Sequence, residues 1–174
     1  PKTSSAASDV YKRQLLFLSF SINAKQVFLG PSNNSQEEIQ EALIDLEPGD
    51  ILTLKPGEYF FEDGLSLDID DVIFEGSGID ETILNFENQM SGAQGLLVTS
   101  NGVTIRDFAV LDAKGDAIKV IGADGIKMIR LRTEWTGGPK ETNGAYGFYP
   151  VESKDVLIRS LIHISEPTRL RSIS

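Results

Sequence analysis

The sequence predicts an all-β fold in which short parallel strands stack as a solenoid behind one N-terminal helix. A short pattern recurs along the chain: a polar residue or glycine, an aliphatic residue, any residue, then an apolar residue. Apolar and polar residues alternate around the copies, as they do in strands, and the apolar residues between the copies do not have the spacing of a helix. Successive copies are 20 to 31 residues apart. A repeat of this length, built from strands and turns, is typical of β-solenoids.

The one helix is expected to begin after residue 34. Four apolar residues there would share one helical face: Ile39, Ala42, Leu43 and Leu46. Ser35 and Glu38 have the spacing of a capping box, in which side chains bind the free backbone N–H groups of the first turn. Pro48-Gly49-Asp50 is expected to end the helix.

The first aliphatic residue of each copy marks the repeat. Four copies are complete, at Val72, Val103, Ile126 and Val156. Leu52 opens an earlier, incomplete copy. Two intervals are longer than the others, and they predict inserted loops at residues 77–95 and 135–147. In the best-matched pair, the apolar residues of 103–110 are expected to stack on those of 126–133.

A β-sandwich with irregular hairpins is the alternative to the solenoid. It would place Asn-Gly or Asp-Gly turns between antiparallel strands. Such turns occur at Asn101-Gly102 and Asp124-Gly125. Both stand immediately before a repeated aliphatic residue, so a corner of a solenoid accounts for both turns, and we favour the solenoid.

The two ends of the chain differ from its middle. Residues 1–14 (PKTSSAASDVYKRQ) and 160–174 (SLIHISEPTRLRSIS) resemble translated sequencing-adapter read-through, and non-native or disordered tails are expected there. Residues 15–24 (LLFLSFSINA) have the length of a signal-peptide core, which predicts a signal remnant cleaved after Ala24; a buried strand is the alternative. This leaves 25–159 as the domain. It is expected to be exported, periplasmic or extracellular, with no membrane span after signal removal.

Composition and charge exclude several function classes. The absence of cysteine excludes disulfides, thiolate zinc sites and a cysteine nucleophile. The net charge of −10 argues against a nucleic-acid partner. The single histidine, His163, falls in the expected C-terminal tail, so the domain itself would lack the commonest general base. The acidity is uneven: residues 25–105 carry two cations against 16 acidic residues, and residues 106–159 carry nine against eight.

The richest segment for a binding site is 130–150. It holds the one tryptophan, two of the four tyrosines and four glycines. Sugar rings stack on aromatic side chains, and Arg and Lys bind the carboxylates of uronic acids. An acidic polysaccharide is therefore the expected ligand, with five substrate-binding residues: Trp135, Tyr146, Tyr149, Glu134 and Asn143. The alternative is that the aromatic side chains pack this loop onto the flank of the solenoid.

A second polar cluster contains Asp112, Lys114 and Asp116. Counting from the repeated aliphatic residues places Asp112 beside Trp135 on the next turn of the stack. The same count places Asp107 beside Arg130, where a structural ion pair is expected.

Two cleavage chemistries stay open besides binding. A β-eliminating lyase needs a base and a group that neutralises the uronate carboxylate, and the catalytic candidates are Arg132, Lys140 and Asp112. Ca²⁺ is the candidate cofactor, with Asp112, Asp116 and Glu134 as oxygen ligands. A glycoside hydrolase, the second choice, needs two carboxylates, for which Asp112 and Glu134 are available.

Two segments resemble known proteins. Residues 36–61 (QEEIQEALIDLEPGD, then ILTLKPGEYFF) resemble the N-terminal cap and first turn of right-handed parallel β-helix proteins of the pectate-lyase-like superfamily. Residues 124–158 (DGIKMIRLRTEWTGGPKETNGAYGFYPVESKDVLI) resemble a family of exported parallel β-helix domain proteins. The resemblance implies a right-handed parallel β-helix with a capping α-helix, truncated at the C-terminus because chains of that family continue for many more turns. The first functional hypothesis is a carbohydrate-directed role, based on the residues of 130–150; a non-catalytic scaffold that acts with another exported protein is the alternative.

Overall fold

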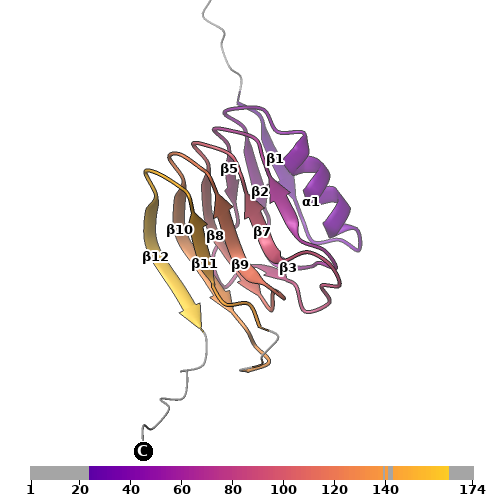
Figure 1. Ribbon diagram of the computed structural model, residues 1–174. Helices are drawn as coiled ribbons and strands as arrows, with labels where there is room; N and C mark the ends of the chain where they lie inside the picture. Colours follow the sequence, from indigo (N-terminus) through magenta and orange to yellow (C-terminus); the bar gives the residue numbers. More distant parts are fainter. Residues whose placement is uncertain (1–23, 139, 141–142, 165–174) are drawn as a thin grey trace, which may run out of the picture.

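The computed structural model describes residues 24–138, 140 and 143–164 (Figure 1). The expected tail 1–14, residues 15–23 of the expected signal remnant and residues 165–174 lie outside this part of the chain. The elements are, in order, β1 (Gln26–Leu29), α1 (Ser35–Ile44), β2 (Ile51–Leu54), β3 (Gly57–Phe60), β4 (Leu65–Leu67), β5 (Ile73–Glu75), β6 (Thr82–Asn85), β7 (Gln94–Val98), β8 (Thr104–Leu111), β9 (Asp116–Ile121), β10 (Lys127–Glu134), β11 (Phe148–Val151) and β12 (Leu157–Ile164). Within these ranges, no helix has the length and apolar character needed to cross a bilayer.

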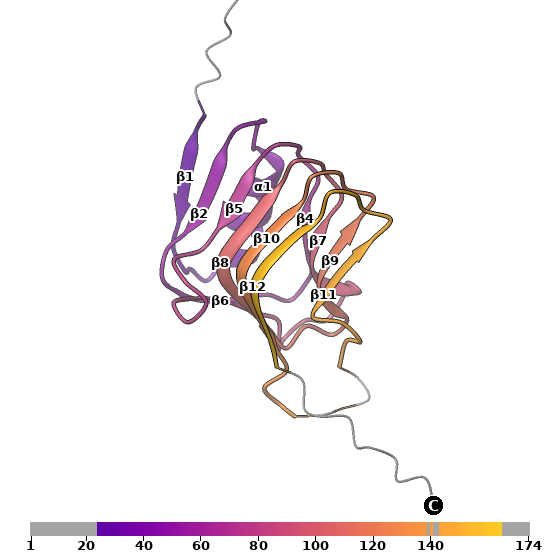
Figure 2. The same cartoon turned by 90° about the vertical axis from the view of Figure 1, so that its left-hand side faces the viewer.

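The strands form two parallel sheets. The larger sheet has the order β1-β2-β5-β8-β10-β12, with β6 beside β8 and β3 beside β6. The smaller sheet has the order β11-β9-β7-β4. The chain passes repeatedly from one sheet to the other, and the two sheets stand as separate rows in Figure 2. All strand pairings of the described residues are parallel, which excludes the sandwich of antiparallel hairpins for this part of the chain.

The hydrophobic core lies between the two sheets and is built from rows of equivalent residues. Fully buried rows are Phe74, Ile105 and Met128 in the larger sheet, and Leu67, Val98 and Val120 in the smaller one. The rings of Phe61 and Phe86 also stack, with centroids 4.8 Å apart. Each such side chain contributes about 1.5–3 kcal/mol on burial, so the rows hold successive circuits of the chain together.

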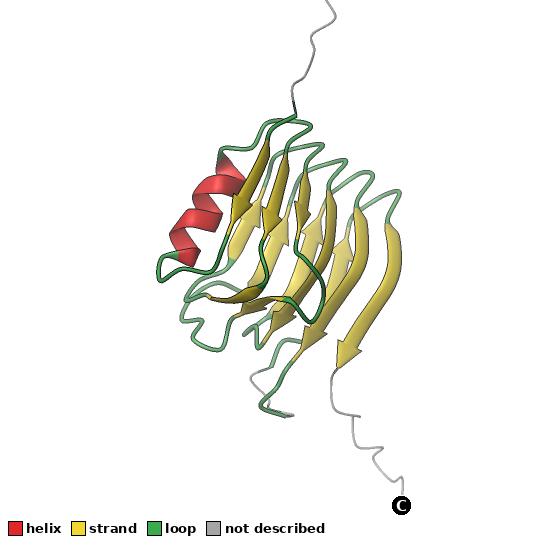
Figure 3. Ribbon diagram, turned by 180° about the vertical axis from the view of Figure 1, so that it is seen from behind, coloured by secondary structure: helices red, strands yellow, loops and turns green. Residues whose placement is uncertain are grey.

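Helix α1 covers one end of the stack. It packs against β1, β3 and β4, and β1 and β4 are the terminal strands of their sheets (Figure 3). Ile39 and Leu43 of its predicted apolar face are buried, so that prediction is confirmed. The predicted capping box is not formed: the hydroxyl of Ser35 donates to the carbonyl of Ser32, and Glu38 accepts from the hydroxyl of Ser32. Both side chains of the expected capping box therefore bind Ser32, which precedes the helix, and not the backbone N–H groups of its first turn.

The predicted stacking of 103–110 on 126–133 is confirmed. Ile105 pairs with Met128, and Val110 pairs with Thr133. The interval between these two strands contains no insertion, so counting along the chain gives the correct register.

The register predicted for the first copy is wrong by two residues. Leu52 pairs with Phe74 rather than with Val72, because Ile51 pairs with Ile73. The buried carboxylate of Asp50 stands at the position of Val72 and accepts backbone N–H groups of Lys25 and Glu47. A shift of two residues keeps every side chain on its own face, so the alternation could not reveal it.

The two predicted insertions differ. The described residues of 135–147, between β10 and β11, contain no strand, which agrees with the predicted loop. Residues 77–95 contain β6 and the start of β7. β6 pairs with both β3 and β8, and Leu84 is fully buried, so this segment belongs to the stack.

Strand β12 passes the domain boundary expected at residue 159. Residues 160–164, expected as part of a non-native or disordered tail, form its second half and pair with β10. The outermost strand of a parallel ladder accepts any extended segment with suitable alternation, because the ladder is made by backbone groups.

The two predicted glycine turns lie between parallel strands, as expected, and not within antiparallel hairpins. The backbone N–H of Gly102 donates to the carbonyl of Asp124, and the backbone N–H of Gly125 donates to the carbonyl of Lys154. In both cases the acceptor belongs to the next repeat along the chain. Both glycines have positive φ angles, 66° and 78°. Glycine adopts this conformation without strain, which explains its place at these corners.

Candidate functional site

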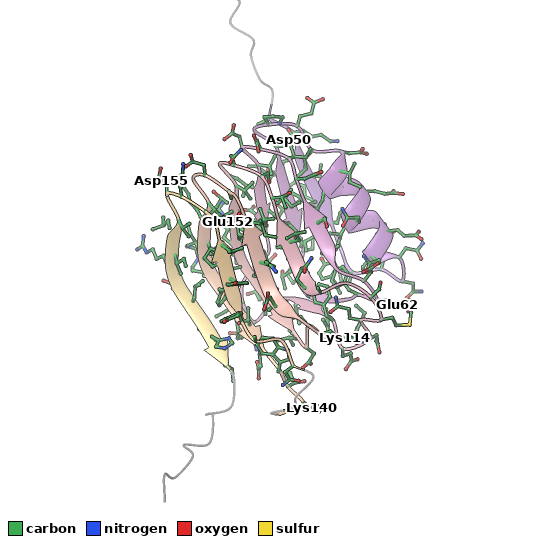
Figure 4. All side chains as sticks on the ribbon, viewed as in Figure 1. Asp50, Glu62, Lys114, Lys140, Glu152 and Asp155 are labelled. Carbon is green, nitrogen blue, oxygen red and sulfur yellow. The ribbon has the colours of Figure 1, made fainter. Side chains whose placement is uncertain are left out.

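A cavity of about 590 Å³ lies where β8 and β10 end and the loop 135–147 begins. Its lining includes one aromatic ring, two lysines, two carboxylates and an amide: Trp135, Lys114, Lys140, Glu87, Asp112 and Asn143. Figure 4 shows Lys114 and Lys140 at the same edge of the stack, away from Asp50 and Asp155. Of the predicted site residues, Asp112, Trp135, Lys140 and Asn143 are therefore brought together.

Trp135 forms a wall of this cavity and is held in place by the preceding circuit. Its Nε1 donates a 2.7 Å hydrogen bond to the carbonyl of Ala113. The half-buried ring also packs against the core. The hydrogen bond and the core contacts agree with the predicted alternative in which Trp135 packs onto the flank, and its place in the lining leaves ligand contact a prediction.

Asp112 anchors the start of the loop. It lies beside Trp135, as predicted, since its N–H donates to the carbonyl of Glu134. Its carboxylate accepts two hydrogen bonds from Thr136, 2.7 Å from the backbone N–H and 2.6 Å from the hydroxyl. Both oxygens are therefore already engaged, which makes Asp112 a residue that positions the loop rather than a free base.

Lys114 and Lys140 reach the cavity from two different segments. The N–H of Lys114 donates to the side-chain oxygen of the buried Gln89 at 2.9 Å. Near Lys140, the side-chain amide of Asn143 donates to the carbonyl of Gly138 at 2.9 Å, and the N–H of Asn143 donates to the carbonyl of Lys140 at 3.1 Å. The backbone of Lys114 is thus held by a side-chain hydrogen bond.

Arg132 and Glu134 point away from the cavity, which corrects their predicted grouping with Lys140 and Asp112. The guanidinium of Arg132 is hydrogen-bonded to Glu134 and donates to the carbonyl of Ile79 at 3.1 Å. The side chain is only 15% exposed, and its Nε has no hydrogen-bond partner among the described residues. Side chains alternate along β10, so Arg132 and Glu134 share the outer face of the strand while the cavity forms beyond its end.

Tyr146, Tyr149 and Asp116 form a separate cluster beside the smaller sheet. The two tyrosine rings stack, with centroids 4.5 Å apart. The ammonium of Lys119 lies 5.4 Å from the ring centroid of Tyr149 and 3.8 Å from the carboxylate of Asp116. None of these four residues lines the cavity at Trp135. The predicted site residues therefore fall in three places on the molecule.

The carboxylates predicted as Ca²⁺ ligands do not fit one metal site. They are Asp112, Asp116 and Glu134. Each is engaged by a different partner: Thr136, Lys119 and Arg132, respectively. The described ranges contain no group of three or more histidine, aspartate or glutamate side chains arranged to hold a metal ion. Asp112 lines the cavity whereas Glu134 is paired with Arg132 and does not line it, so the two carboxylates expected for glycoside hydrolysis do not share the cavity.

The predicted ion pair between Asp107 and Arg130 is confirmed, and it is bidentate. Arg130 Nε and Nη2 lie 2.5 and 2.7 Å from the two carboxylate oxygens of Asp107. This hydrogen-bonded partner raises the pKa of the Arg130 guanidinium above its ordinary value. Both residues have positive φ angles at the bend of their strands, so the pair joins equivalent bends in successive circuits.

Sequence reasoning missed Glu87 as a cavity residue. Glu87 follows β6, which falls within the predicted insertion 77–95. Because Asn85 pairs with Leu111, the turn after β6 lies beside the turn after β8. Recognition of β6 as a strand would have placed Glu87 next to Ala113.

Comparison with protein-family models and with curated proteins finds no match. Among solved structures, that of the PL6-family alginate lyase AlyGC is similar, with a TM-score of 0.55 and 16% sequence identity. The likeness covers 79% of this chain and 20% of that one, so the chain spans about a fifth of the length of the lyase. At this identity the likeness is one of fold.

Proposed function

We propose that the chain is the N-terminal part of an exported right-handed parallel β-helix protein, and that it binds acidic, uronate-containing polysaccharide in the cavity at Trp135. The parallel sheets, the covering helix and the fold likeness to an alginate lyase support the architecture. The ligand class is supported above all by the cavity itself, in which an aromatic ring stands with two lysines.

The chemistry of a uronic acid matches this lining. Its C–H face can stack on the half-buried indole of Trp135. Its carboxylate can pair with Lys114 or Lys140, and its hydroxyls can donate to Glu87. The carboxylate of Asp112 accepts two hydrogen bonds from Thr136, and the two ammonium groups offset its charge and that of Glu87. The name of the similar structure, an alginate lyase, is consistent with a uronate polymer as ligand.

Binding is tested by fluorescence, because Trp135 is the only tryptophan of the chain. Titration with oligogalacturonate and oligomannuronate is expected to give a saturable change in emission, and a neutral cello-oligosaccharide a much weaker one. Lys114→Ala and Lys140→Ala should each weaken the acidic oligosaccharides about tenfold, the effect of losing one charge-assisted contact. Lys154→Ala is the matched control, since Lys154 is exposed at a corner bridged to Asp124.

Two results would contradict this proposal. One is a wild-type chain whose emission no acidic oligosaccharide changes; in that case the scaffold that acts with another exported protein becomes the better reading. The other is a Lys154→Ala variant that loses as much affinity as Lys140→Ala, which would indicate diffuse charge attraction rather than a site.

Lyase-type cleavage is the second candidate, favoured by the presence of two lysines in one cavity. In β-elimination one lysine would neutralise the uronate carboxylate, and the other would take the C5 proton. The electron pair left at C5 forms the C4–C5 double bond as the bond from C4 to the glycosidic oxygen breaks, and that oxygen keeps the bonding pair and takes a proton from water to become a hydroxyl. The unsaturated product absorbs in the ultraviolet. Absorbance that grows with wild type but not with Lys140→Ala supports cleavage, and binding without absorbance restricts this part of the protein to recognition.

A further inference from the structure

We propose that the cavity at Trp135 is one end of a longer groove, whose other end is a second cavity beside Phe60, and that the groove takes a heteropolysaccharide in which uronic acid alternates with a neutral sugar. This inference rests on the proposed function and names the class of polysaccharide that the site takes. The uronate would bind at the first cavity and the neutral sugar at the second.

The second cavity has a volume of about 320 Å³ and lies beside the start of α1. Its lining includes one aromatic ring, three asparagine amides and two carboxylates: Phe60, Asn33, Asn34, Asn88, Glu37 and Glu62. Phe60 is 49% exposed although it ends a strand of the larger sheet. None of the described lining residues is a lysine or arginine.

The two cavities lie along the same edge of the stack. Phe60 pairs with Asn85, Asn85 with Leu111, and Leu111 with Glu134, the residue before Trp135. The two ends of this row are three strand spacings apart, which is roughly 14 Å. Figure 4 shows Glu62, Lys114 and Lys140 along one edge, with Glu62 nearest the helix. A short oligosaccharide has the length to reach both cavities.

Two adjacent residues, Glu87 and Asn88, link the two cavities. Glu87 lines the first and the adjacent Asn88 lines the second. The buried amide of Gln89, the next residue, is itself hydrogen-bonded: its nitrogen donates to the carbonyls of Ser91 and Gln94, and its oxygen accepts from the N–H of Lys114. These bonds hold the residues between the two cavities to the segment that carries Lys114 before any ligand binds.

The charges of the two cavities select different sugars. Lys114 and Lys140 of the first attract a carboxylate and balance the charges of Glu87 and Asp112, so the charged side chains of its lining sum to zero. Glu37 and Glu62 of the second would repel one, whereas a neutral sugar can donate its hydroxyls to them and stack on Phe60. A polymer of uronic acid alone would place a carboxylate in both cavities, and the repulsion in the second would lower its affinity.

The test compares three oligosaccharides of equal length by titration of the full chain. They are an oligosaccharide that alternates glucuronic acid with glucose, an oligogalacturonate and a cello-oligosaccharide. The alternating ligand is expected to bind about tenfold more tightly than the oligogalacturonate. Phe60→Ala and, independently, Asn88→Ala should remove this preference and leave the oligogalacturonate affinity unchanged. Glu62→Gln should raise the oligogalacturonate affinity, because it removes a repulsive charge.

Phe28→Ala is the matched control, since Phe28 is 54% exposed on β1 and lines neither cavity. It should leave both affinities unchanged. Equal affinities for the alternating and the homopolymeric ligand, or a preference that survives both Phe60→Ala and Asn88→Ala, would overturn the groove while the acidic-polysaccharide site at Trp135 stands. Failure of every acidic ligand to bind would remove the proposed function, and this inference with it.

Discussion

The indole nitrogen of Trp135 donates a 2.7 Å hydrogen bond to the carbonyl of Ala113, so the wall of the candidate site on one circuit is held by the backbone of the circuit before it. The loop that follows Trp135 is tied to the same turn through Thr136 and the carboxylate of Asp112. The candidate site is thus built from the contact between two neighbouring turns, and variants at these residues should affect both stability and binding.

Substitution of Trp135 separates the contribution of its ring from that of its hydrogen bond. Trp135→Phe keeps an aromatic ring and should lower the free energy of unfolding by about 1 kcal/mol, the usual net value of one hydrogen bond. Trp135→Ala also removes the packing of a half-buried ring and should lower it by about 3 kcal/mol. Urea unfolding followed by circular dichroism measures both values. Equal stability of Trp135→Ala and wild type would show that the ring does not hold the loop to the core.

Asp112 is expected to tolerate asparagine far better than alanine. Its φ angle of 55° lies in the left-handed region, which asparagine adopts more readily than alanine. Asparagine also keeps one oxygen as acceptor for Thr136, whereas alanine loses both hydrogen bonds. Asp112→Ala should therefore be less stable than Asp112→Asn by about 1–2 kcal/mol. Chemical denaturation of the two variants checks this order, and the reverse order would contradict the anchoring role.

The ion pair between Asp107 and Arg130 should contribute little to stability because Arg130 is half exposed. Arg130→Ala is expected to cost less than about 1 kcal/mol, and high salt should reduce this difference. Arg130 has a φ angle of 49°. Arg130→Gly should therefore be at least as stable as Arg130→Ala, because glycine relieves the left-handed strain. Thermal unfolding at low and high salt provides the comparison, and a much larger loss in Arg130→Ala would show that the pair has a structural role beyond the surface.

Tyr59 should make the fold sensitive to strong alkali. Its buried hydroxyl lies 2.8 Å from the carbonyl of Lys55 and 3.1 Å from that of Leu29, and burial raises its pKa from 10.0 to about 12. The folded state therefore favours the protonated phenol. This stabilisation is complete below pH 10 and is lost as the pH rises from about 10 to about 12.

Tyr59→Phe isolates this effect from the other groups that titrate in alkali. Near neutral pH the variant should be less stable than wild type by about 1 kcal/mol, because it lacks the hydrogen bond. Between pH 10 and 12 the difference should shrink as wild type loses its advantage. Urea unfolding of both proteins across this range measures the difference, and a constant gap would mean that the phenol ionises equally in the folded and unfolded states.

Several features of this protein could be predicted from local pattern alone. The apolar face of α1 follows from the helical period of Ile39 and Leu43. The register of β8 and β10, and with it the neighbours Asp107 and Arg130, follows from counting along an interval without insertions. In these cases the pattern of nearby residues determines the outcome, because the helical face is local and no insertion separates β8 from β10.

Other features depended on contacts that no local pattern contains. The segment 77–95 was predicted as an inserted loop, but it contains the strand β6. The pairing of β6 with β3 and β8 brings Glu87 to the cavity. Arg132 was grouped with Lys140 because the two are close in sequence. The alternation of β10 places Arg132 on the outer face, with Glu134, instead.

The sequence by itself therefore determined the parallel β architecture, the covering helix, the glycine corners and the pairing of Asp112 with the turn of Trp135. Only the tertiary structure decided which charged side chains share a cavity and that a second cavity lies on the same edge beside Phe60. The physical reason is that alternation specifies the face of a strand on which a residue lies. The alignment of turns of unequal length depends on backbone pairing and core packing between circuits that are far apart in the chain.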